Sequence, residues 1–225
     1  NRMMAWSTNL GAVRFLREMA SPAQRILFPT TNSGYGVGEP DKPCDENSPL
    51  NPLSLYARLK VKAEAVVLER ENSLTFRFAT LFGASPRMRL DLLVNDFVHR
   101  AVRDRFVVLF EAGFRRNYLH VQDAARAFLW AMEHFDEMRG GPYNIGLPDA
   151  NLTKRELCEG IKAHVPDFYF TEAAVGEDVD KRDYVVSNDR ILATGWRPQY
   201  SLDDGIRELI KAYEMMDGPG PIRNA

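Results

Sequence analysis

The first third of the chain alternates between two patterns of apolar residues. From residue 9 to 19 the apolar side chains recur at helical spacing, and the apolar run at 26–28 is typical of a short buried strand. Start signals and apolar spacing predict a second helix from about residue 54 to 69, and a second strand follows at 74–79. Helices that alternate with buried strands indicate an α/β protein.

The elements after residue 83 are shorter and more mixed. Two capping-box patterns, Thr153 with Glu156 and Ser201 with Asp204, mark the first turns of helices. The remaining pattern indicates helices at about 91–103, 124–135, 153–164 and 201–215, and strands at 106–110, 115–121 and 143–146. A parallel α/β region therefore comes first, and a second lobe of smaller elements follows it.

A long loop is expected at residues 31–53, where glycines and prolines crowd the segment 34–43. Loops of this length in compact domains are usually functional. The loop begins with the hydroxyl-rich run Thr30-Thr-Asn-Ser33, which follows the first buried strand directly. Open α/β sheets bind ligands at the carboxyl ends of their strands, so this run is a candidate site.

Composition and charge exclude several classes of protein. The 225 residues are 45% hydrophobic and 27% charged, which is ordinary for a folded chain and unlike a disordered one. With a net charge of -2 there is no basic field, so we expect no binding to nucleic acid or membrane. The two cysteines and four histidines show no metal-ligand spacing, and no apolar run approaches the ~18 residues of a membrane span. We expect a cytoplasmic protein without a metal.

Tyr56 and Lys60 are the strongest candidates for chemistry. Their i, i+4 spacing places both side chains on one face of the second helix. An ammonium near a phenol lowers the tyrosine pKa, which would let Tyr56 exchange a proton with an alcohol. The spacing alone favours an exposed pair on a helix surface, so the context must decide.

Several segments in order supply that context. They are Asn9 in its helix, Pro29-Thr-Thr-Asn-Ser-Gly-Tyr-Gly36, Tyr56-Ala-Arg-Leu-Lys60, Arg77-Phe-Ala-Thr-Leu-Phe-Gly83, Arg116-Asn-Tyr-Leu-His-Val-Gln-Asp123, Tyr143-Asn-Ile-Gly146 and Thr194-Gly-Trp-Arg-Pro198. With these segments the chain resembles the extended short-chain dehydrogenase/reductases that act on nucleotide-linked sugars, the NAD-dependent epimerases and dehydratases. The resemblance covers nearly the whole chain.

The resemblance implies a Rossmann-like doubly wound parallel sheet with a smaller mixed α/β substrate-binding lobe. We expect residues 1–83, with 114–146 returning to them, to form the catalytic part, and 84–113 with 147–225 to form the lobe. The Gly-x-Gly-x-x-Gly fingerprint of the family is missing from the sequence. We therefore expect the N-terminal strands, on the order of 90 residues, to be absent before Asn1.

The resemblance also assigns roles to individual residues. The implied catalytic residues are Thr31, Tyr56 and Lys60, and the implied cofactor-binding residues are Asn9, Tyr56, Lys60, Phe78 and Ala79. The implied substrate-binding residues are Ser33, Thr80, Asp91, Leu92, Arg116 and Arg182. Thr80 departs from the asparagine that many members carry. For Arg87, Arg89 and Arg182 a solvated surface position is about as well supported as a ligand role.

The residues after Thr31 discriminate among reactions. Dehydratases of this kind carry Asp-Glu there and related decarboxylases carry Glu at position 33, whereas this chain has Asn32 and Ser33, which do not titrate. The resemblance then implies an NAD-dependent nucleotide-sugar epimerase that acts by transient oxidation, most often at C4. The alternatives are a nucleotide-sugar dehydrogenase, a keto-sugar reductase, or a catalytically incomplete sugar-nucleotide-binding or oligomerisation module.

The resemblance further implies a cofactor and partners. The cofactor is NAD, with NADP left open, and the substrate is a nucleotide-diphosphate sugar. Relatives pair through two helices, so we expect a homodimer in which residues 8–20 and 53–70 pack against a second copy. The alternative is that either helix is covered only by its own sheet.

Overall fold

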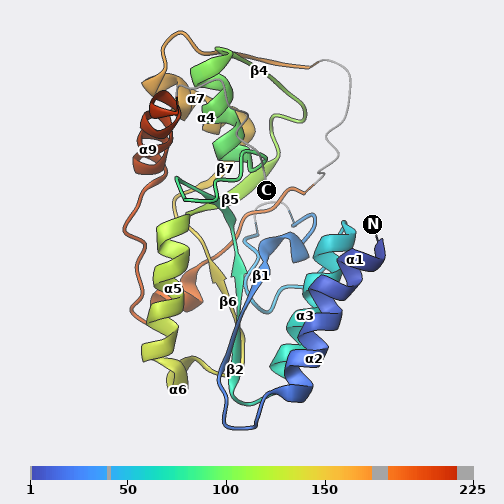
Figure 1. The fold of residues 1–225 in the computed structure, drawn as a ribbon. Coiled ribbons are helices and arrows are strands. Elements are labelled where there is room, and N and C mark those ends of the chain that lie inside the picture. The colour runs from blue at the N-terminus through green and yellow to red at the C-terminus, as the bar shows by residue number, and fades with distance from the viewer. Residues whose placement is uncertain (1, 40–41, 174–181, 217–225) are drawn as a thin grey trace.

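The computed structural model describes residues 2–39, 42–173 and 182–216 (Figure 1). The chain begins with a helical rod made of α1 (Arg2–Trp6), a π-helical turn at Ser7–Gly11 and α2 (Ala12–Met19). The predicted helix at 9–19 is therefore confirmed and extends further toward the N-terminus. The rod buries Leu10 and Val13 against the next helix, which explains why these apolar positions recur at helical spacing.

The main sheet is parallel and has the strand order β1-β2-β6. Its strands are β1 (Ile26–Thr31), β2 (Ser73–Phe78) and β6 (Pro142–Ile145). Every residue of β2 is buried, as expected for a central strand that is covered on both faces. β1 is longer than the predicted 26–28 because it pairs with β2 along its whole length, up to Thr31 opposite Phe78.

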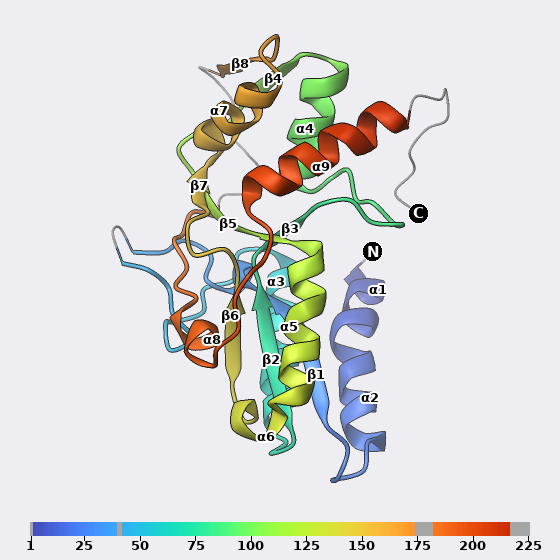
Figure 2. The same cartoon turned by 90° about the vertical axis from the view of Figure 1, so that its left-hand side faces the viewer.

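Helices cover both faces of this sheet (Figures 1 and 2). α3 (Leu55–Leu68) packs on β1 and β2 together with α2, and α5 (Val121–Glu133) covers the other face. The side chains beneath α5 form a core with Phe76, Ala127 and Ile145. The Rossmann-like doubly wound arrangement expected from the sequence is confirmed.

The chain leaves the main sheet at Ala79. The Ala79 amide still donates to the Ile145 carbonyl (2.9 Å), but the next residues form β3 (Thr80–Phe82) in a second sheet. That sheet has the order β3-β5-β7, with β5 (Arg115–His120) parallel to β3 and β7 (Asn151–Thr153) antiparallel to β5. The prediction of one strand at 74–79 misses this change of sheet, because three residues carry no periodic signal.

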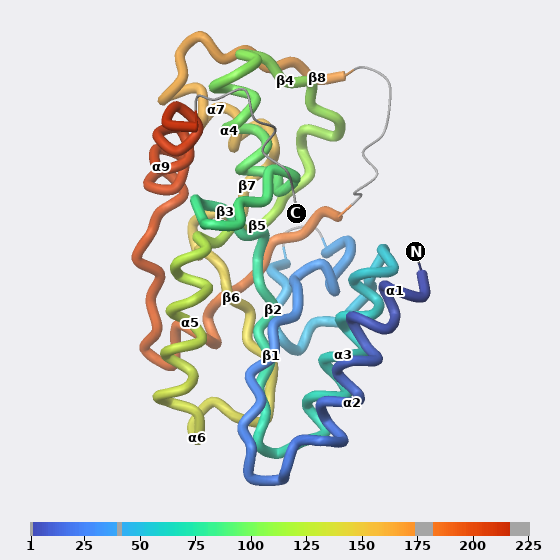
Figure 3. The backbone as a smooth tube through the Cα atoms, in the orientation of Figure 1, coloured from blue at the N-terminus to red at the C-terminus, as the bar shows by residue number. Residues whose placement is uncertain are grey.

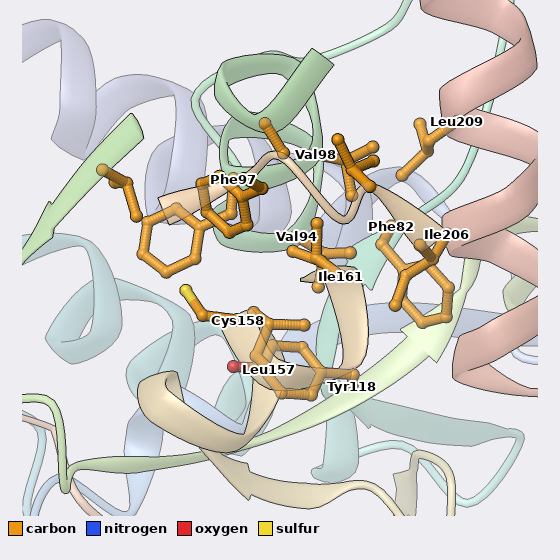
Figure 4. Close-up of a cluster of buried hydrophobic side chains, with 14 of the residues drawn as sticks. Phe82, Val94, Phe97, Val98, Tyr118, Leu157, Cys158, Ile161, Ile206 and Leu209 are labelled. Carbon is orange, nitrogen blue, oxygen red and sulfur yellow. The ribbon is translucent and has the colours of Figure 1, made fainter. Parts of the chain in front are cut away.

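The later elements enclose a second core (Figure 4). They are α4 (Leu93–Arg103), β4 (Phe106–Leu109), α7 (Lys154–His164), β8 (Tyr169–Glu172) and α9 (Leu202–Met215). Phe82, Val98 and Leu209 are among its buried side chains. Both predicted capping boxes are present at the starts of α7 and α9. The division of the chain into a catalytic part and a substrate-binding lobe stays a prediction.

The trace in Figure 3 shows the connections between these layers. The predicted helix at 124–135 is α5 followed by the separate turn α6 (Phe135–Met138), and a short helix α8 (Asp189–Ala193) lies beside β6. Among the described residues, no helix is long and apolar enough to cross a membrane. The same residues include no group of His, Cys, Asp or Glu side chains arranged to hold a metal ion.

Candidate active site

A cavity of about 1030 Å³ lies at the carboxyl ends of β1 and β2. Open parallel sheets bind their ligands in this position. Most of the predicted site residues line it: Thr31, Ser33, Tyr56, Lys60, Phe78, Ala79, Thr80, Leu92 and Arg182. Asn9, Asp91 and Arg116 do not line it. The structure thus brings the predicted catalytic residues together, while their roles stay predictions.

The end of β1 presents two hydroxyl groups to the cavity. β1 stops at Thr31, and residues 32–34 form a single 3-10 turn. The Thr31 hydroxyl caps this turn by accepting from the Ser33 amide (3.1 Å), and it donates to the Ser33 hydroxyl (2.9 Å). Arg182 donates to the same Ser33 oxygen. The pair of hydroxyls is therefore held in place by local turn geometry and by a cation from a distant part of the chain.

Tyr56 and Lys60 reach the cavity from the first turns of α3. Ser54 begins the helix by accepting from the Ala57 amide (3.1 Å). Lys60 Nζ donates to the Pro29 carbonyl of β1 (2.8 Å) and lies 4.6 Å from the centre of the Phe28 ring. Because both side chains line one cavity beside Thr31, the interpretation as a site is favoured over an exposed surface pair.

The electrostatics of Tyr56 differ from the sequence-based expectation. Burial raises the pKa of Tyr56 above its ordinary value, and the charges of Arg89 and Arg182 offset only part of this rise. Burial lowers the pKa of Lys60, because the ammonium loses water. The expectation that Lys60 lowers the Tyr56 pKa is not met: the Lys60 ammonium binds the Pro29 carbonyl, and the two arginines supply the positive charge.

Arg89 lines the cavity, whereas the sequence alone left it undecided between a solvated surface position and a ligand role. Its guanidinium forms two bonds with the Asp91 carboxylate, at 3.1 and 2.5 Å. The buried Asn95 amide holds the surrounding backbone, since its Nδ2 donates to the Arg89 carbonyl (2.9 Å) and its Oδ1 accepts from the Gly83 amide (3.1 Å). Asp91 therefore lies beside the cavity as the partner of Arg89.

Other cavity residues come from segments far apart in the sequence. They are Pro29, Thr30, Leu53, Ser54, Leu81, Arg89 and Tyr184. Neither Leu53 nor Tyr184 stands in a motif with a chemical signature, so no local signal could have placed them at the site.

Two predicted residues lie away from the cavity wall. Asn9 donates its side-chain amide to the Ala5 carbonyl (3.0 Å) within its own helical rod. Arg116 is buried in β5, and its guanidinium lies 5.9 Å from the centre of the Tyr184 ring. Tyr184 lines the cavity, so the Tyr184 side chain connects Arg116 to the cavity wall. The roles expected for Asn9 and Arg116 remain predictions.

The residues at the end of β2 fit one end of a nicotinamide dinucleotide. Phe78 and Ala79 offer an apolar wall for a flat ring, and Tyr56 and Lys60 offer donors for a ribose diol. A Gly-x-Gly-x-x-Gly turn for the pyrophosphate does not occur in the sequence. The fit therefore concerns the nicotinamide riboside end.

Comparison with known proteins agrees with this geometry. The model of the NAD dependent epimerase/dehydratase family matches residues 3–146. Low-salt glycan biosynthesis protein Agl12 of Haloferax volcanii is 28% identical over 92% of this chain and 68% of its own length. Human dTDP-D-glucose 4,6-dehydratase is 26% identical over 84% of this chain and 56% of its own length. The chain thus spans just over half to about two thirds of the length of these relatives.

A solved structure shares the fold. The crystal structure of Thermus thermophilus UDP-glucose 4-epimerase in complex with NAD has a TM-score of 0.76 and 22% identity, over 92% of this chain and 71% of the epimerase chain. The family match covers more than half of the chain and includes the segments that carry Thr31, Tyr56 and Lys60. The family expected from the sequence motifs is confirmed: the chain belongs to the NAD dependent epimerase/dehydratase family.

Proposed function

We propose that the chain carries the acid/base centre and the substrate side of an NAD-dependent nucleotide-sugar epimerase that inverts C4. The observation that carries the proposal is the meeting of Thr31, Tyr56 and Lys60 in one cavity at the end of a parallel sheet. The family description and the NAD complex of the Thermus epimerase support the cofactor. NADP remains an alternative cofactor.

The chain's own residues would move the proton. The small phenolate fraction that the raised pKa of Tyr56 leaves at neutral pH would take the proton of the sugar hydroxyl, while the Thr31 hydroxyl holds that oxygen by a hydrogen bond. Phe78 and Ala79 would hold the nicotinamide of NAD, which would supply the hydride acceptor for the sugar carbon and then the hydride donor. The phenol of Tyr56 then gives its proton back to the oxygen of the inverted sugar. Lys60 keeps its helix bonded to β1 during both steps.

The cations at the cavity suit an anionic substrate. Arg89 and Arg182 both line the cavity wall, and the positive charge of each lowers the pKa of Tyr56. Planar guanidinium groups bind phosphate oxygens with two parallel hydrogen bonds. We propose that they face the diphosphate of a nucleotide sugar, with Leu92 beside the nucleotide.

Asn32 argues for epimerisation over dehydration. It is 1% exposed, and among the described residues neither atom of its amide has a hydrogen-bond partner. Neither Asn32 nor Ser33 can donate or accept a proton as a carboxyl group does. Water elimination needs such an acid and base.

The alternatives keep the same cavity. A dehydrogenase would release the keto-sugar and a keto-sugar reductase would consume one, with Tyr56 in the same role. The alternative from another class is a binding or oligomerisation module without turnover, which the missing glycine fingerprint favours.

One experiment separates these functions. Purified chain is mixed with NAD and UDP-glucose, and separately with other nucleotide hexoses; sugar products are followed by NMR and reduced cofactor by absorbance. For chain that binds NAD, we expect a C4 epimer without net build-up of NADH, and no epimer from the Tyr56→Phe variant. Stoichiometric NADH without an epimer would identify a dehydrogenase. Binding of the nucleotide sugar without any NAD binding or turnover would identify the module.

We also propose a homodimer. The helical rod exposes a row of large apolar side chains, with Phe15 63% and Met19 68% exposed, and the rod packs beside α3. Pairing with a second copy would cover this face. We expect wild type to sediment as a dimer and Phe15→Glu to sediment as a monomer. Because Phe15 is already exposed to solvent in the single chain, this substitution is expected to leave the fold of the monomer intact. A wild-type monomer at all accessible concentrations contradicts the dimer.

A further inference from the structure

A buried ion pair lies beneath the candidate active site. Glu64 of α3 and Arg77 of β2 are each 6% exposed, and Arg77 Nη2 donates to Glu64 Oε1 at 2.6 Å. Arg77 Nε donates to both carboxylate oxygens at 3.1 Å. The pair therefore bonds the Tyr-Lys helix to the central strand of the sheet through three contacts.

Glu64 lies on the same face of α3 as the candidate catalytic residues. Tyr56, Lys60 and Glu64 follow one another at four-residue intervals, so they form one row along the helix. Thr30 donates to the Glu64 carboxylate (2.9 Å), and Thr30 precedes Thr31 in β1. The Glu64 side chain thus joins the helix that carries Tyr56 to the strand that ends at Thr31.

Arg77 continues the contacts on its other side. Its Nη1 donates to the Tyr35 hydroxyl (3.0 Å) and to the Glu46 carbonyl (3.2 Å). The Tyr35 oxygen also lies 2.7 Å from Asn144 Oδ1 in β6. Burial raises the pKa of Tyr35 to about 12, so its hydroxyl keeps its proton at neutral pH. The network joins α3, the three strands of the main sheet and the loop after residue 34.

Stability alone does not explain such a network. Removing two charges from water costs free energy that their attraction often only balances, and well-packed apolar side chains frequently replace a buried pair without loss of stability. An apolar pair, however, lacks the directional hydrogen bonds that fix the orientation of one element on another. Hydrogen bonds from β1 and β2 to the Glu64 carboxylate set the height and rotation of α3 on the sheet, whereas apolar contact permits sliding.

We propose that Glu64 and Arg77 are positioning residues of the candidate active site: their ion pair fixes α3 so that Tyr56 and Lys60 meet Thr31. The expected effect of the ion pair on turnover rests on the proposed function. Its expected effect on the positions of Tyr56 and Lys60 is independent of that function.

The test uses the apolar double variant E64L/R77M in the full chain. It removes the network but leaves no buried charge without a partner, so it is expected to fold with a melting temperature near that of wild type. The single variants E64Q and R77M each leave a buried polar group unpaired and are expected to melt lower. The matched control is V67A, which trims a buried apolar residue of the same helix outside the network.

The first readout does not depend on turnover. The ionisation of Tyr56 is measured as the phenolate absorbance of each variant minus that of the same variant with Tyr56→Phe. In E64L/R77M the phenol leaves surroundings in which burial raises its pKa and Arg89 and Arg182 lower it, so its midpoint is expected to move from the wild-type value by about half a pH unit or more in one direction or the other. In V67A the midpoint is expected to stay at the wild-type value even though the melting temperature falls.

The second readout applies once turnover is measurable. E64L/R77M is expected to lose roughly tenfold or more in kcat with KM within about twofold, because placement of the acid/base group affects the reaction step more than binding. R77K, which keeps the charge, is expected to recover part of the loss seen in R77M. A folded double variant with the wild-type Tyr56 midpoint and kcat would overturn the inference. If wild type shows no turnover, the proposed function fails, and the Tyr56 midpoint alone decides the inference.

Discussion

Lys60 Nζ donates a 2.8 Å hydrogen bond to the Pro29 carbonyl, two residues before Thr31. This bond ties the helix that carries Tyr56 to the strand that presents the Thr31 hydroxyl. Burial lowers the pKa of Lys60, so its ammonium is held at some cost in free energy. The Lys60 ammonium is thus held in a defined position at some expense of the free energy of unfolding.

Replacing Lys60 tests that relationship. Lys60→Met removes the bond to Pro29 and is expected to lower turnover by about tenfold or more. Its melting temperature near neutral pH should not fall below that of Lys62→Met, an exposed control on the same helix, because a partly buried charge is removed. Since the folded pKa of Lys60 is depressed, wild-type stability relative to Lys60→Met should increase as pH rises through that pKa toward the unfolded value. A clear loss of stability at pH 7 would show that Lys60 has a structural role instead.

Tyr56→Phe removes the proposed acid/base group while keeping the ring. Turnover is expected to fall roughly a hundredfold to ten-thousandfold, with binding of the nucleotide sugar nearly unchanged. Isothermal titration calorimetry and product NMR measure the two effects. Tyr169→Phe, an exposed tyrosine in β8, is the matched control and should behave as wild type. Retained epimerisation in Tyr56→Phe would remove Tyr56 from the mechanism.

Arg89 should affect the pH dependence of the site. Its charge lowers the Tyr56 pKa, so Arg89→Gln is expected to raise that pKa and to reduce the phenolate fraction at any given pH. The rising limb of the kcat/KM profile then moves to higher pH, as does the phenolate absorbance of the isolated chain. Arg87→Gln, two residues away, is the control. Equal shifts in both variants would mean that net charge, and not the position of Arg89, is responsible.

The loop that follows Thr31 depends on a glycine. Gly36 has φ +72°, and a Cβ there would lie 2.0 Å from the Asn51 carbonyl oxygen. Gly36→Ala combines strain with a backbone clash and is expected to cost about 3 kcal/mol of unfolding free energy. Gly140 has φ +88° with nothing within 4 Å of its Cβ, so Gly140→Ala should cost only about 1 kcal/mol of strain. Denaturant unfolding compares them, and equal costs would contradict the clash.

Local spacing predicted the helices and the buried strands of the main sheet well. Tyr56 and Lys60 share a helix face, and the capping boxes of α7 and α9 are where the sequence indicates. These features depend on residues within one or two turns of each other, so a pattern in the sequence reports them directly. The short strands β3, β7 and β8 were missed, because three or four residues show no period and form strands only where a neighbour pairs with them.

The sequence by itself determined which chemical groups the site contains: a phenol, an ammonium and two hydroxyls at the end of a buried strand. Only the tertiary structure decided which charges lie near them. It placed Arg89 and Arg182 beside Tyr56, turned the Lys60 ammonium to Pro29, kept Asn9 and Arg116 off the cavity wall, and set the Glu64–Arg77 pair beneath. The physical reason is range: helix and strand periods arise from neighbouring residues, whereas desolvation and Coulomb interactions depend on long-range packing of the chain.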